Sequence, residues 1–233
     1  MSENAGSPTS ESLTPESLTR HTDYGHDGLL ESDVVGHPMA HFAQWIIDAE
    51  NADIFEPNAM VLGTIDPDGR PSSRTVLLKS LDTGENGGPG ALEFVTNYQS
   101  HKGRALLANP LATALFPWYA LKRQVIFTGR VMPTEPDLSD DYFNRRPHGA
   151  RLAAIASDQS EPVASRGILE ERMAVLESEY PEGEPIPRPE KWGGFRFIPE
   201  SIELWQGRSM RFHDRLLFTL HADGTWTRER LQP

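Results

Sequence analysis

The feature that most constrains the fold is a series of short apolar runs, each bounded by turn-forming residues. Residues 59–65 form one run and lead into Asp66-Pro67-Asp68-Gly69, a strong turn signal, and residues 74–81 return as the expected hairpin partner. Further strand-like runs follow at residues 91–96, 111–118, 124–131, 195–198, 202–205, 215–220 and 225–231. About eight or nine short strands joined mostly by hairpin-length loops predict an antiparallel sheet or barrel.

Three stretches are predicted to be helical. Residues 38–50 carry large apolar side chains at three- and four-residue spacing, the pattern of an amphipathic helix: Met39, Phe42, Trp45 and Ile46. A short helix is expected over residues 102–108, and a longer helical section over 137–179 has a break at Pro147-His148-Gly149. Because this section separates two sets of strands, one barrel must be completed from both ends of the chain. The predicted class is mainly β with helices (α+β), an antiparallel barrel flanked by helices in a single domain over residues 21–233.

The N-terminal residues and the composition indicate the cellular compartment in which the protein is expected to act. Residues 1–20 are mostly Ser, Thr, Glu and Pro with almost no large apolar side chain, which predicts a disordered tail. No run approaches the ~20 apolar residues of a membrane span, and the Met1 end lacks the basic-then-apolar pattern of a signal peptide. The absence of Cys excludes disulfides, thiolate metal sites and a catalytic thiol. We therefore expect a cytoplasmic protein that does not bind membranes.

The charge is acidic overall but locally basic. There are 22 Lys and Arg residues against 34 Asp and Glu residues, a formal net charge of −12, which argues against nucleic acid as a partner. Basic residues nevertheless recur in tight islands: Arg70 with Arg74 and Lys79, residues 101–104, residues 122–123, residues 145–146, and Arg208 with Arg211 and Arg215. Such islands suit small anionic ligands held in pockets, although each alone could be a solvated loop charge.

Several common sites have no support in the sequence. No GxGxxG or GxxxxGK[ST] pattern for nucleotides is present, and neither is a GxSxG serine elbow. His37 and His41 are four residues apart, as metal ligands on a helix can be, but no third ligand is evident and no catalytic Glu lies between them. Helix-surface histidines are the favoured interpretation, and no metal is expected.

Two patterns suggest anion sites near strand ends. The odd spacing of Arg74 and Lys79 sends their side chains to opposite faces of one strand, which could then serve two separate anions. A helix that begins near Ser100 would present free amides and Lys102 to a phosphate. An edge strand with solvated charges and a plain Ser100 N-cap are the competing interpretations.

A third cluster lies near the C-terminus, where Trp205-Gln206-Gly207 precedes Arg211-Phe212-His213-Asp214-Arg215. Arg211, His213 and Arg215 share parity, so an extended segment would direct all three side chains to one face. Such crowding of cations is costly unless an anion or an electron-rich ring lies between them.

These residues also carry a resemblance. In order and with sensible spacing from Tyr24 to Pro233, the chain resembles the pyridoxine/pyridoxamine 5'-phosphate oxidase family in the strings RTVLLK, FVTNYQSHKG, FPWYALKRQV, YFNRRP, SDQS, SRGILEE, WGGFR, IELWQG, RFHDR and RLQP. The resemblance implies a split antiparallel β-barrel, a homodimer, and FMN in two clefts at the subunit interface. It also implies oxidation of pyridoxine or pyridoxamine 5'-phosphate to pyridoxal 5'-phosphate, with O2 reduced to hydrogen peroxide.

The resemblance assigns a cofactor site. Arg74 and Lys102 are expected to bind the FMN phosphate, helped by polar contacts from Gln159 and Ser160, which come from the other subunit or from the helical section. His101 occupies a position that is usually Arg, which gives this phosphate a weaker and pH-dependent partner. The remaining expected cofactor contacts are Thr75, Val76, Leu77, Leu78, Lys79, Val95, Thr96, Gln124, Trp205 and Arg215.

The resemblance also assigns a substrate site. Lys79, Tyr142 and Arg146 match the residues that bind the substrate phosphate, and Ala150 stands where a Ser is usual, which removes one hydroxyl donor that adjacent Arg151 could replace. Tyr24 matches a residue that closes over the substrate. Arg211 and His213 are the expected catalytic pair with Phe212 between them, and His213 is expected to position or relay protons near its normal titration range.

Two other functions keep the fold. A related flavin oxidase of the phenazine type would act on another substrate, and a non-catalytic flavin- or pyridoxal-phosphate-binding carrier is conceivable because of His101 and Ala150. The matched residues Tyr142, Arg146, Arg211 and His213 favour the vitamin B6 substrate.

Overall fold

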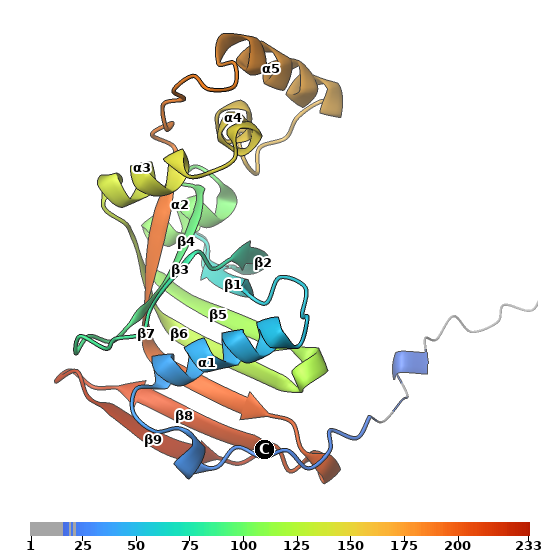
Figure 1. Ribbon diagram of the computed structural model, residues 1–233, viewed down its shortest axis with the longest axis vertical. Helices are drawn as coiled ribbons and strands as arrows, with labels where there is room; N and C mark the ends of the chain where they lie inside the picture. The colour runs from blue at the N-terminus through green and yellow to red at the C-terminus, as the bar shows by residue number, and fades with distance from the viewer. Residues whose placement is uncertain (1–15, 19, 21) are drawn as a thin grey trace, which may run out of the picture.

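The computed structural model describes residues 16–18, 20 and 22–233, so most of the predicted tail over residues 1–20 lies outside the described residues (Figure 1). In the described part of the chain, nine strands form one sheet, and each strand pair is antiparallel. The strands are β1 (Ala59–Ile65), β2 (Pro71–Leu77), β3 (Ser80–Asp82), β4 (Ala91–Asn97), β5 (Leu111–Trp118), β6 (Arg123–Pro133), β7 (Trp192–Gln206), β8 (Asp214–Leu220) and β9 (Trp226–Leu231).

The helices are α1 (Pro38–Asn51), α2 (His101–Ala108), α3 (Pro136–Asn144), α4 (His148–Ala156) and α5 (Arg166–Glu179). Short 3-10 turns lie at η1 (Glu16–Leu18), η2 (Glu31–Asp33), η3 (Tyr119–Leu121) and η4 (Ser209–Arg211). Helix α1 crosses the sheet beside β5 and β6, whereas α3, α4 and α5 gather at the far end of β4 and β7 (Figure 1). The predicted helical section thus contains a second break between α4 and α5, at residues 157–165.

Strand β7 organises the sheet. The order of the main path is β2-β1-β5-β6-β7-β4-β3, and β8 and β9 extend from β7 beside it. One edge of β7 pairs with β4 over residues 192–197 and with β8 over residues 201–206, while β6 pairs along the other edge. Strands β4 and β8 therefore pair with different halves of the same edge of β7. The sheet is the predicted split antiparallel barrel, and the predicted fold class is confirmed.

The prediction of two separate strands at residues 195–198 and 202–205 is wrong, because β7 is one strand of 15 residues. Its pairing with β6 shifts between Thr128, which lies opposite Ser201, and Gly129, which lies opposite Pro199. Glu200 is the extra residue of this irregularity. A bulge tolerates a proline that lacks a donor, so Pro199 bends the strand without ending it.

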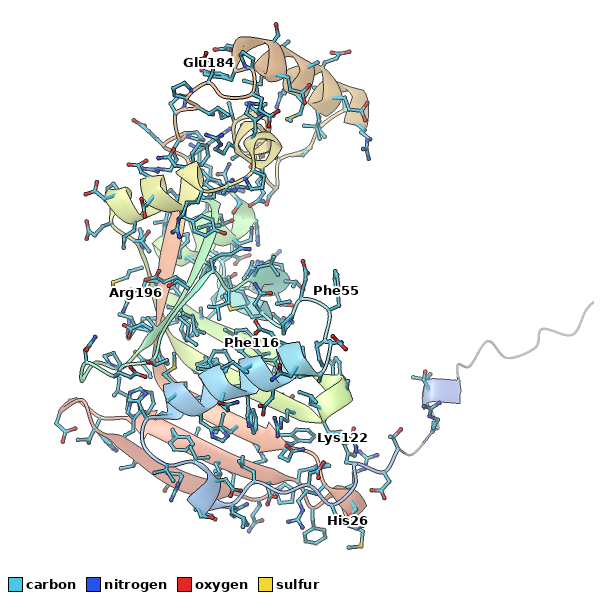
Figure 2. The ribbon with its side chains drawn as sticks, in the orientation of Figure 1. His26, Phe55, Phe116, Lys122, Glu184 and Arg196 are labelled. Atoms are coloured by element: carbon cyan, nitrogen blue, oxygen red, sulfur yellow. The ribbon has the colours of Figure 1, made fainter. Side chains whose placement is uncertain are left out.

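The main core lies between α1 and the sheet. As the apolar spacing predicts, Met39, Phe42 and Trp45 are buried, and Phe42 packs against Phe116 and Phe127 with ring centroids 4.8 Å apart in each case. Figure 2 shows Phe116 next to helix α1. Burial of one such side chain stabilises a fold by about 1.5–3 kcal/mol.

A second, smaller core cluster fixes the helical end of the molecule. Phe143 of α3, Leu152 of α4 and Ile186 pack with Trp192, the first residue of β7. This cluster holds α3 and α4 against the sheet and so determines where their polar faces lie. No helix among the described residues combines the length and apolar content that a bilayer crossing requires.

Candidate active site

A cleft of about 940 Å3 lies where β2, β4 and α2 meet α3 and α4. Five cationic side chains line it, and among its described lining residues there is no carboxylate, although the chain as a whole has 34 acidic residues. The lining residues are Arg74, Thr75, Val76, Leu77, Lys79, Val95, Thr96, Asn97, Lys102, Tyr142, Arg145, Arg146, Pro147, Ala150, Ala153, Ala154, Ser157, Gln159 and Trp192. We call this space the basic cleft.

Arg74 and Lys79 both line the basic cleft, so the expectation that alternation separates them is wrong. Strand β2 ends at Leu77, and the chain then leaves the β1 hairpin. The backbone N–H of Lys79 donates to the Glu93 carbonyl over 2.7 Å. The backbone therefore changes its partner from Asn58, at Leu78, to Glu93 of β4, at Lys79, so the two-residue alternation of β2 does not extend to Lys79.

Arg74 is held by neutral oxygens. Its Nη1 donates to Thr64 Oγ1 over 2.7 Å and to the Leu62 carbonyl over 3.1 Å, and its Nη2 donates to Ser72 Oγ over 2.6 Å. Burial lowers the pKa of the guanidinium below its ordinary value. These contacts fix the direction of the side chain. No described carboxylate pairs with its charge, which is a favourable arrangement for an anionic ligand.

Lys102 lies in the first turn of α2, where Ser100 caps the helix by accepting from the Gly103 N–H over 3.2 Å. Its Nζ donates to Thr96 Oγ1 over 3.0 Å and to Gln159 Oε1 over 2.9 Å. Burial and the neighbouring positive charge of Arg74 lower the pKa of Lys102 to about 8. Gln159 thus comes from the helical section of the same chain.

Six predicted cofactor residues do not line the basic cleft, and three of these, Gln124, Trp205 and Arg215, lie on β6, β7 and β8. His101 is exposed, and its Nε2 lies 3.9 Å from Asp66 Oδ2. Ser160 is exposed and has a positive φ of 75°, and Leu78 is buried in the main core. The other nine predicted cofactor residues line the basic cleft.

The substrate-site candidates Tyr142, Arg146 and Ala150 line the basic cleft from α3, the following turn and α4. Arg146 Nη1 is buried and has no hydrogen-bond partner among the described residues, and burial lowers the pKa of this guanidinium. Arg151 is not among the lining residues, so it does not replace the hydroxyl missing at Ala150.

The sequence interpretation missed Trp192, whose indole lies under the Arg146 guanidinium, 4.7 Å from Cζ to the ring centroid. It is the first residue of the WGGFR string, so the string marked the position without indicating a role.

The remaining site candidates gather at the C-terminal end of β7, and we call Tyr24, Trp205, Arg211, Phe212 and His213 the aromatic cluster. The Trp205 and His213 ring centroids are 4.7 Å apart, and Tyr24 contacts both rings edge-on, at 6.0 and 5.2 Å. A Cβ atom on Gly207 would lie 2.5 Å from Tyr24 Cδ1, so the absence of a side chain there permits the close approach of Tyr24.

The loop that carries Arg211 is not extended. Met210 and Arg211 have positive φ values of 54° and 63° within turn η4, and β8 begins only at Asp214. The parity argument for Arg211, His213 and Arg215 is therefore wrong, because two left-handed residues break the alternation. Phe212 is 70% exposed.

His213 has a defined hydrogen-bonding state. Its Nδ1 accepts from the backbone N–H of Arg208 over 3.1 Å. Burial and the positive charge of Arg211 lower the pKa of His213. The pKa of His213 therefore lies below its ordinary value, because both effects disfavour the imidazolium.

Strand register places three predicted flavin contacts in one row. Gln124 of β6 lies opposite Trp205 of β7, and Trp205 lies opposite Arg215 of β8. Arg215 also forms a bidentate ion pair with Glu203, with N–O distances of 2.8 and 3.0 Å, which raises the pKa of Arg215. This pair fixes the guanidinium beside Trp205.

The basic cleft and the aromatic cluster share no residue. Helices α3 and α4, beside the cleft, lie at the top of Figure 1, whereas the cluster adjoins β8 at the bottom. His26, which follows Tyr24 closely in sequence, is also at the bottom (Figure 2). One chain thus presents two groups of candidate residues at opposite ends.

Histidine pairing does not create a metal site. His37 caps α1, since its Nδ1 accepts from the Met39 N–H over 3.2 Å, and the His41 ring packs against Trp45 at 5.1 Å. Within the described part of the chain, no three His, Cys, Asp or Glu side chains gather in a way that could hold a metal ion.

Comparison with known proteins finds two family regions along the chain. Residues 47–179 match the family described as pyridoxamine 5'-phosphate oxidase, and residues 192–233 match the pyridoxine 5'-phosphate oxidase C-terminal dimerisation region. A pyridoxine/pyridoxamine 5'-phosphate oxidase from Herminiimonas arsenicoxydans is 47% identical over 212 residues, which cover 91% of this chain and 97% of that protein.

Two crystal structures are similar. PhzG from Burkholderia lata 383, in complex with tetrahydrophenazine-1-carboxylic acid, has a TM-score of 0.81 and 29% identity, covering 90% of this chain and 100% of that one. A pyridoxamine 5'-phosphate oxidase-related, FMN binding protein from Nostoc punctiforme has a TM-score of 0.65 and 16% identity, covering 85% and 99% of the two chains, which shows a shared fold. Together with the matched regions, these similarities establish that the chain belongs to the pyridoxine/pyridoxamine 5'-phosphate oxidase family.

Proposed function

We propose that this protein is an FMN-dependent oxidase that converts pyridoxamine or pyridoxine 5'-phosphate to pyridoxal 5'-phosphate, with O2 as the electron acceptor and hydrogen peroxide as the second product. The observation that carries the proposal is the basic cleft, with five cations and no carboxylate among its described lining residues. Arg145 lies 4.0 Å from Asp141, but the other four cations have no acidic partner among the described residues. In a chain of net charge −12, this concentration of positive charge favours a ligand or ligands with several negative charges.

The residues present fit an FMN phosphate at one end of the basic cleft. Arg74 and Lys102 are close enough for the charge of one to lower the pKa of the other, and both donate only to neutral oxygens. A phosphate between them would receive charge-assisted hydrogen bonds and relieve their mutual repulsion. Val76, Leu77 and Val95 supply apolar surface in the same cleft for a flat ring.

The other end of the basic cleft fits the substrate phosphate. In the part of the chain that the structure describes, the buried Nη1 of Arg146 has no hydrogen-bond partner, and a phosphate oxygen would satisfy it. Lys79 and Tyr142 line the same space. Leaving a buried charged donor unpaired is costly, so its presence supports a ligand that completes the site. Two separate phosphate positions would give Arg74 and Lys102 one anion and Lys79 and Arg146 the other.

Bound FMN would supply the hydride acceptor and transfer the electrons onward to O2. The chain's own contribution is binding and orientation. Arg211 would orient the substrate ring and stabilise developing negative charge, and neutral His213 would donate from Nε2, since Nδ1 already accepts from Arg208. Tyr24, packed on His213, would cover the bound ring.

A homodimer would join the two groups of residues. Arg211 and His213 do not line the basic cleft of their own chain, and they belong to the region that matches a dimerisation family. We infer that the aromatic cluster of one subunit completes the basic cleft of its partner, with FMN at the interface. A single chain would then hold both halves of the chemistry and no complete site.

Anaerobic addition of pyridoxamine 5'-phosphate to the yellow holoenzyme tests the proposal. The flavin absorbance is expected to bleach, and admission of O2 is expected to restore it with one equivalent of peroxide. A preparation that takes up FMN but does not bleach would support a carrier. One that takes up no FMN would contradict the proposal.

The similarity to PhzG favours a second candidate, an oxidase of a reduced phenazine carboxylate. Such a ligand has one carboxylate where a B6 phosphate has a dianionic group, so it would leave more of the cleft's positive charge unpaired. Bleaching by tetrahydrophenazine-1-carboxylic acid, with no response to pyridoxamine 5'-phosphate, would identify this alternative.

A further inference from the structure

Trp192 contacts two residues that the proposed function assigns to the substrate phosphate. The guanidinium of Arg146 lies over its indole at 4.7 Å, and the ring of Tyr142 is nearly parallel to it, with an interplanar angle of 24° and a centroid distance of 6.2 Å. The indole thus serves as a common platform for a cation and a phenol that come from one helix and the turn after it.

Arg146 has little else to fix its position. No ion pair of Arg146 is found among the described residues, and its buried Nη1 has no hydrogen-bond partner. A guanidinium on an indole face gains electrostatic and dispersion energy without using its N–H donors. The Trp192 contact therefore restrains the side chain and leaves its donors free for an anion.

Trp192 itself is rigidly placed. It is 5% exposed, and its ring meets Phe143 edge-on at 5.2 Å. Arg188 donates from Nη1 to the Trp192 carbonyl over 2.7 Å and from Nε to Asp140 Oδ1 over 2.6 Å. Asp140 is on α3 with Tyr142, so Arg188 ties the start of β7 to the helix that carries one of the phosphate ligands.

We propose that Trp192 is a positioning residue for substrate phosphate recognition, acting through Arg146 and Tyr142. The inference rests on the proposed function and adds a residue to it. A flexible Arg146 would have to be ordered each time a phosphate binds, whereas an Arg146 held on the indole is ordered beforehand. The expected contribution is to the binding of the phosphorylated substrate and not to the rate of the chemical step.

The test compares Trp192→Leu, which removes the aromatic face, with Trp192→Phe, which retains one. Trp192→Leu is expected to raise KM for pyridoxamine 5'-phosphate about tenfold and to change kcat by less than about twofold. Trp192→Phe is expected to restore KM to within about threefold of wild type. Trp226→Leu, at a half-buried tryptophan outside the cleft, is the matched control and should leave KM unchanged.

The decisive readout is the preference for pyridoxamine 5'-phosphate over unphosphorylated pyridoxamine, taken as a ratio of kcat/KM values. We expect this ratio to fall about tenfold in Trp192→Leu. An equal loss with both substrates would overturn the inference, because it would show a general structural role. So would an unchanged KM.

Calorimetric titration with pyridoxal 5'-phosphate separates this inference from the proposed function. If the wild-type holoenzyme binds the ligand without turnover, the proposed reaction fails, and weaker binding by Trp192→Leu than by Trp192→Phe still supports the positioning role. Equal binding by both variants overturns it. A wild-type protein that binds no phosphorylated ligand contradicts both.

Discussion

The Nδ1 atom of His213 accepts a hydrogen bond from the backbone N–H of Arg208 over 3.1 Å, within the loop that joins β7 to β8. A neutral imidazole that accepts at Nδ1 carries its proton on Nε2. Protonation of Nδ1 would break this bond and place a second positive charge beside Arg211. The loop therefore holds His213 as a neutral donor.

Because His213 is neutral in this loop, its protonation at low pH should reduce activity. The pH profile of kcat/KM should therefore have an acid limb that depends on His213. Since the pKa of His213 lies below its ordinary value of 6.5, the neutral form predominates at pH 7, and activity should fall only as the pH drops below 6.5. The limb is measured as kcat/KM between pH 5 and 8 and compared with that of His213→Asn, because titration of the substrate phosphate is common to both. A limb of the same size and midpoint in His213→Asn would contradict the assignment.

We predict that FMN affinity decreases at high pH, because Lys102 then loses its positive charge. Its pKa is lowered to about 8, so the apoprotein loses this positive charge above that pH. FMN affinity should therefore be nearly constant between about pH 7 and 8, where the FMN phosphate is mostly dianionic, and fall by up to about tenfold per pH unit above pH 8, as measured by quenching of flavin fluorescence. Lys102→Arg keeps the charge and should remain flat to pH 9.5. A wild-type affinity that is also flat would show that Lys102 does not bind the phosphate.

His101 is predicted to matter much less than its neighbour. It is exposed and faces Asp66 outside the basic cleft, so His101→Ala should change the FMN dissociation constant by less than about threefold. Lys102→Met, which removes a half-buried cation, should weaken binding by more than about tenfold. Equal effects of the two substitutions would mean that His101 turns toward the cofactor when it binds.

Local patterns predicted the elements that depend on local interactions. Residues 59–65 and 111–118 are strands with the expected bounds. The turn signal Asp66-Pro67-Asp68-Gly69 follows the first strand, and Asn109-Pro110 precedes the second. The continuity of β7 could not be predicted, since Pro199 is an ordinary break signal and only its pairing with Gly129 of a distant strand accommodates it. The continuity of β7 therefore depends on pairing with a strand far away in the sequence and not on the residues around Pro199.

The candidate site likewise contains some residues that the sequence reveals and others that only the three-dimensional packing reveals. Arg74 and Lys102 belong to strings that the sequence displays, and both line the basic cleft. Trp192 depends on packing between α3 and β7, so no spacing rule points to it. The left-handed backbone at Met210 and Arg211 could not be anticipated, because neither residue is a glycine.

Ala150 predicts a gain of affinity on substitution. It lines the basic cleft at the position where a Ser is expected, and Arg151 does not fill the same space. Ala150→Ser would add a hydroxyl donor to the substrate phosphate, and a neutral hydrogen bond contributes about 0.5–1.5 kcal/mol, so KM should fall about two- to tenfold with little change in kcat. An unchanged or raised KM would show that the added hydroxyl does not reach the phosphate.

Subunit complementation tests whether the active site is shared between chains. Lys79→Ala disables the basic cleft, and Arg211→Ala disables the aromatic cluster, so each homodimer should have low activity. In a heterodimer of the two variants, one shared site would carry both substitutions and the other would carry neither. Heterodimers isolated through two different affinity tags should therefore regain about half of the wild-type activity per dimer. If each chain instead formed its own complete site, every site in the heterodimer would carry one substitution, and mixing would restore nothing. Wild-type heterodimers with the same two tags provide the reference activity.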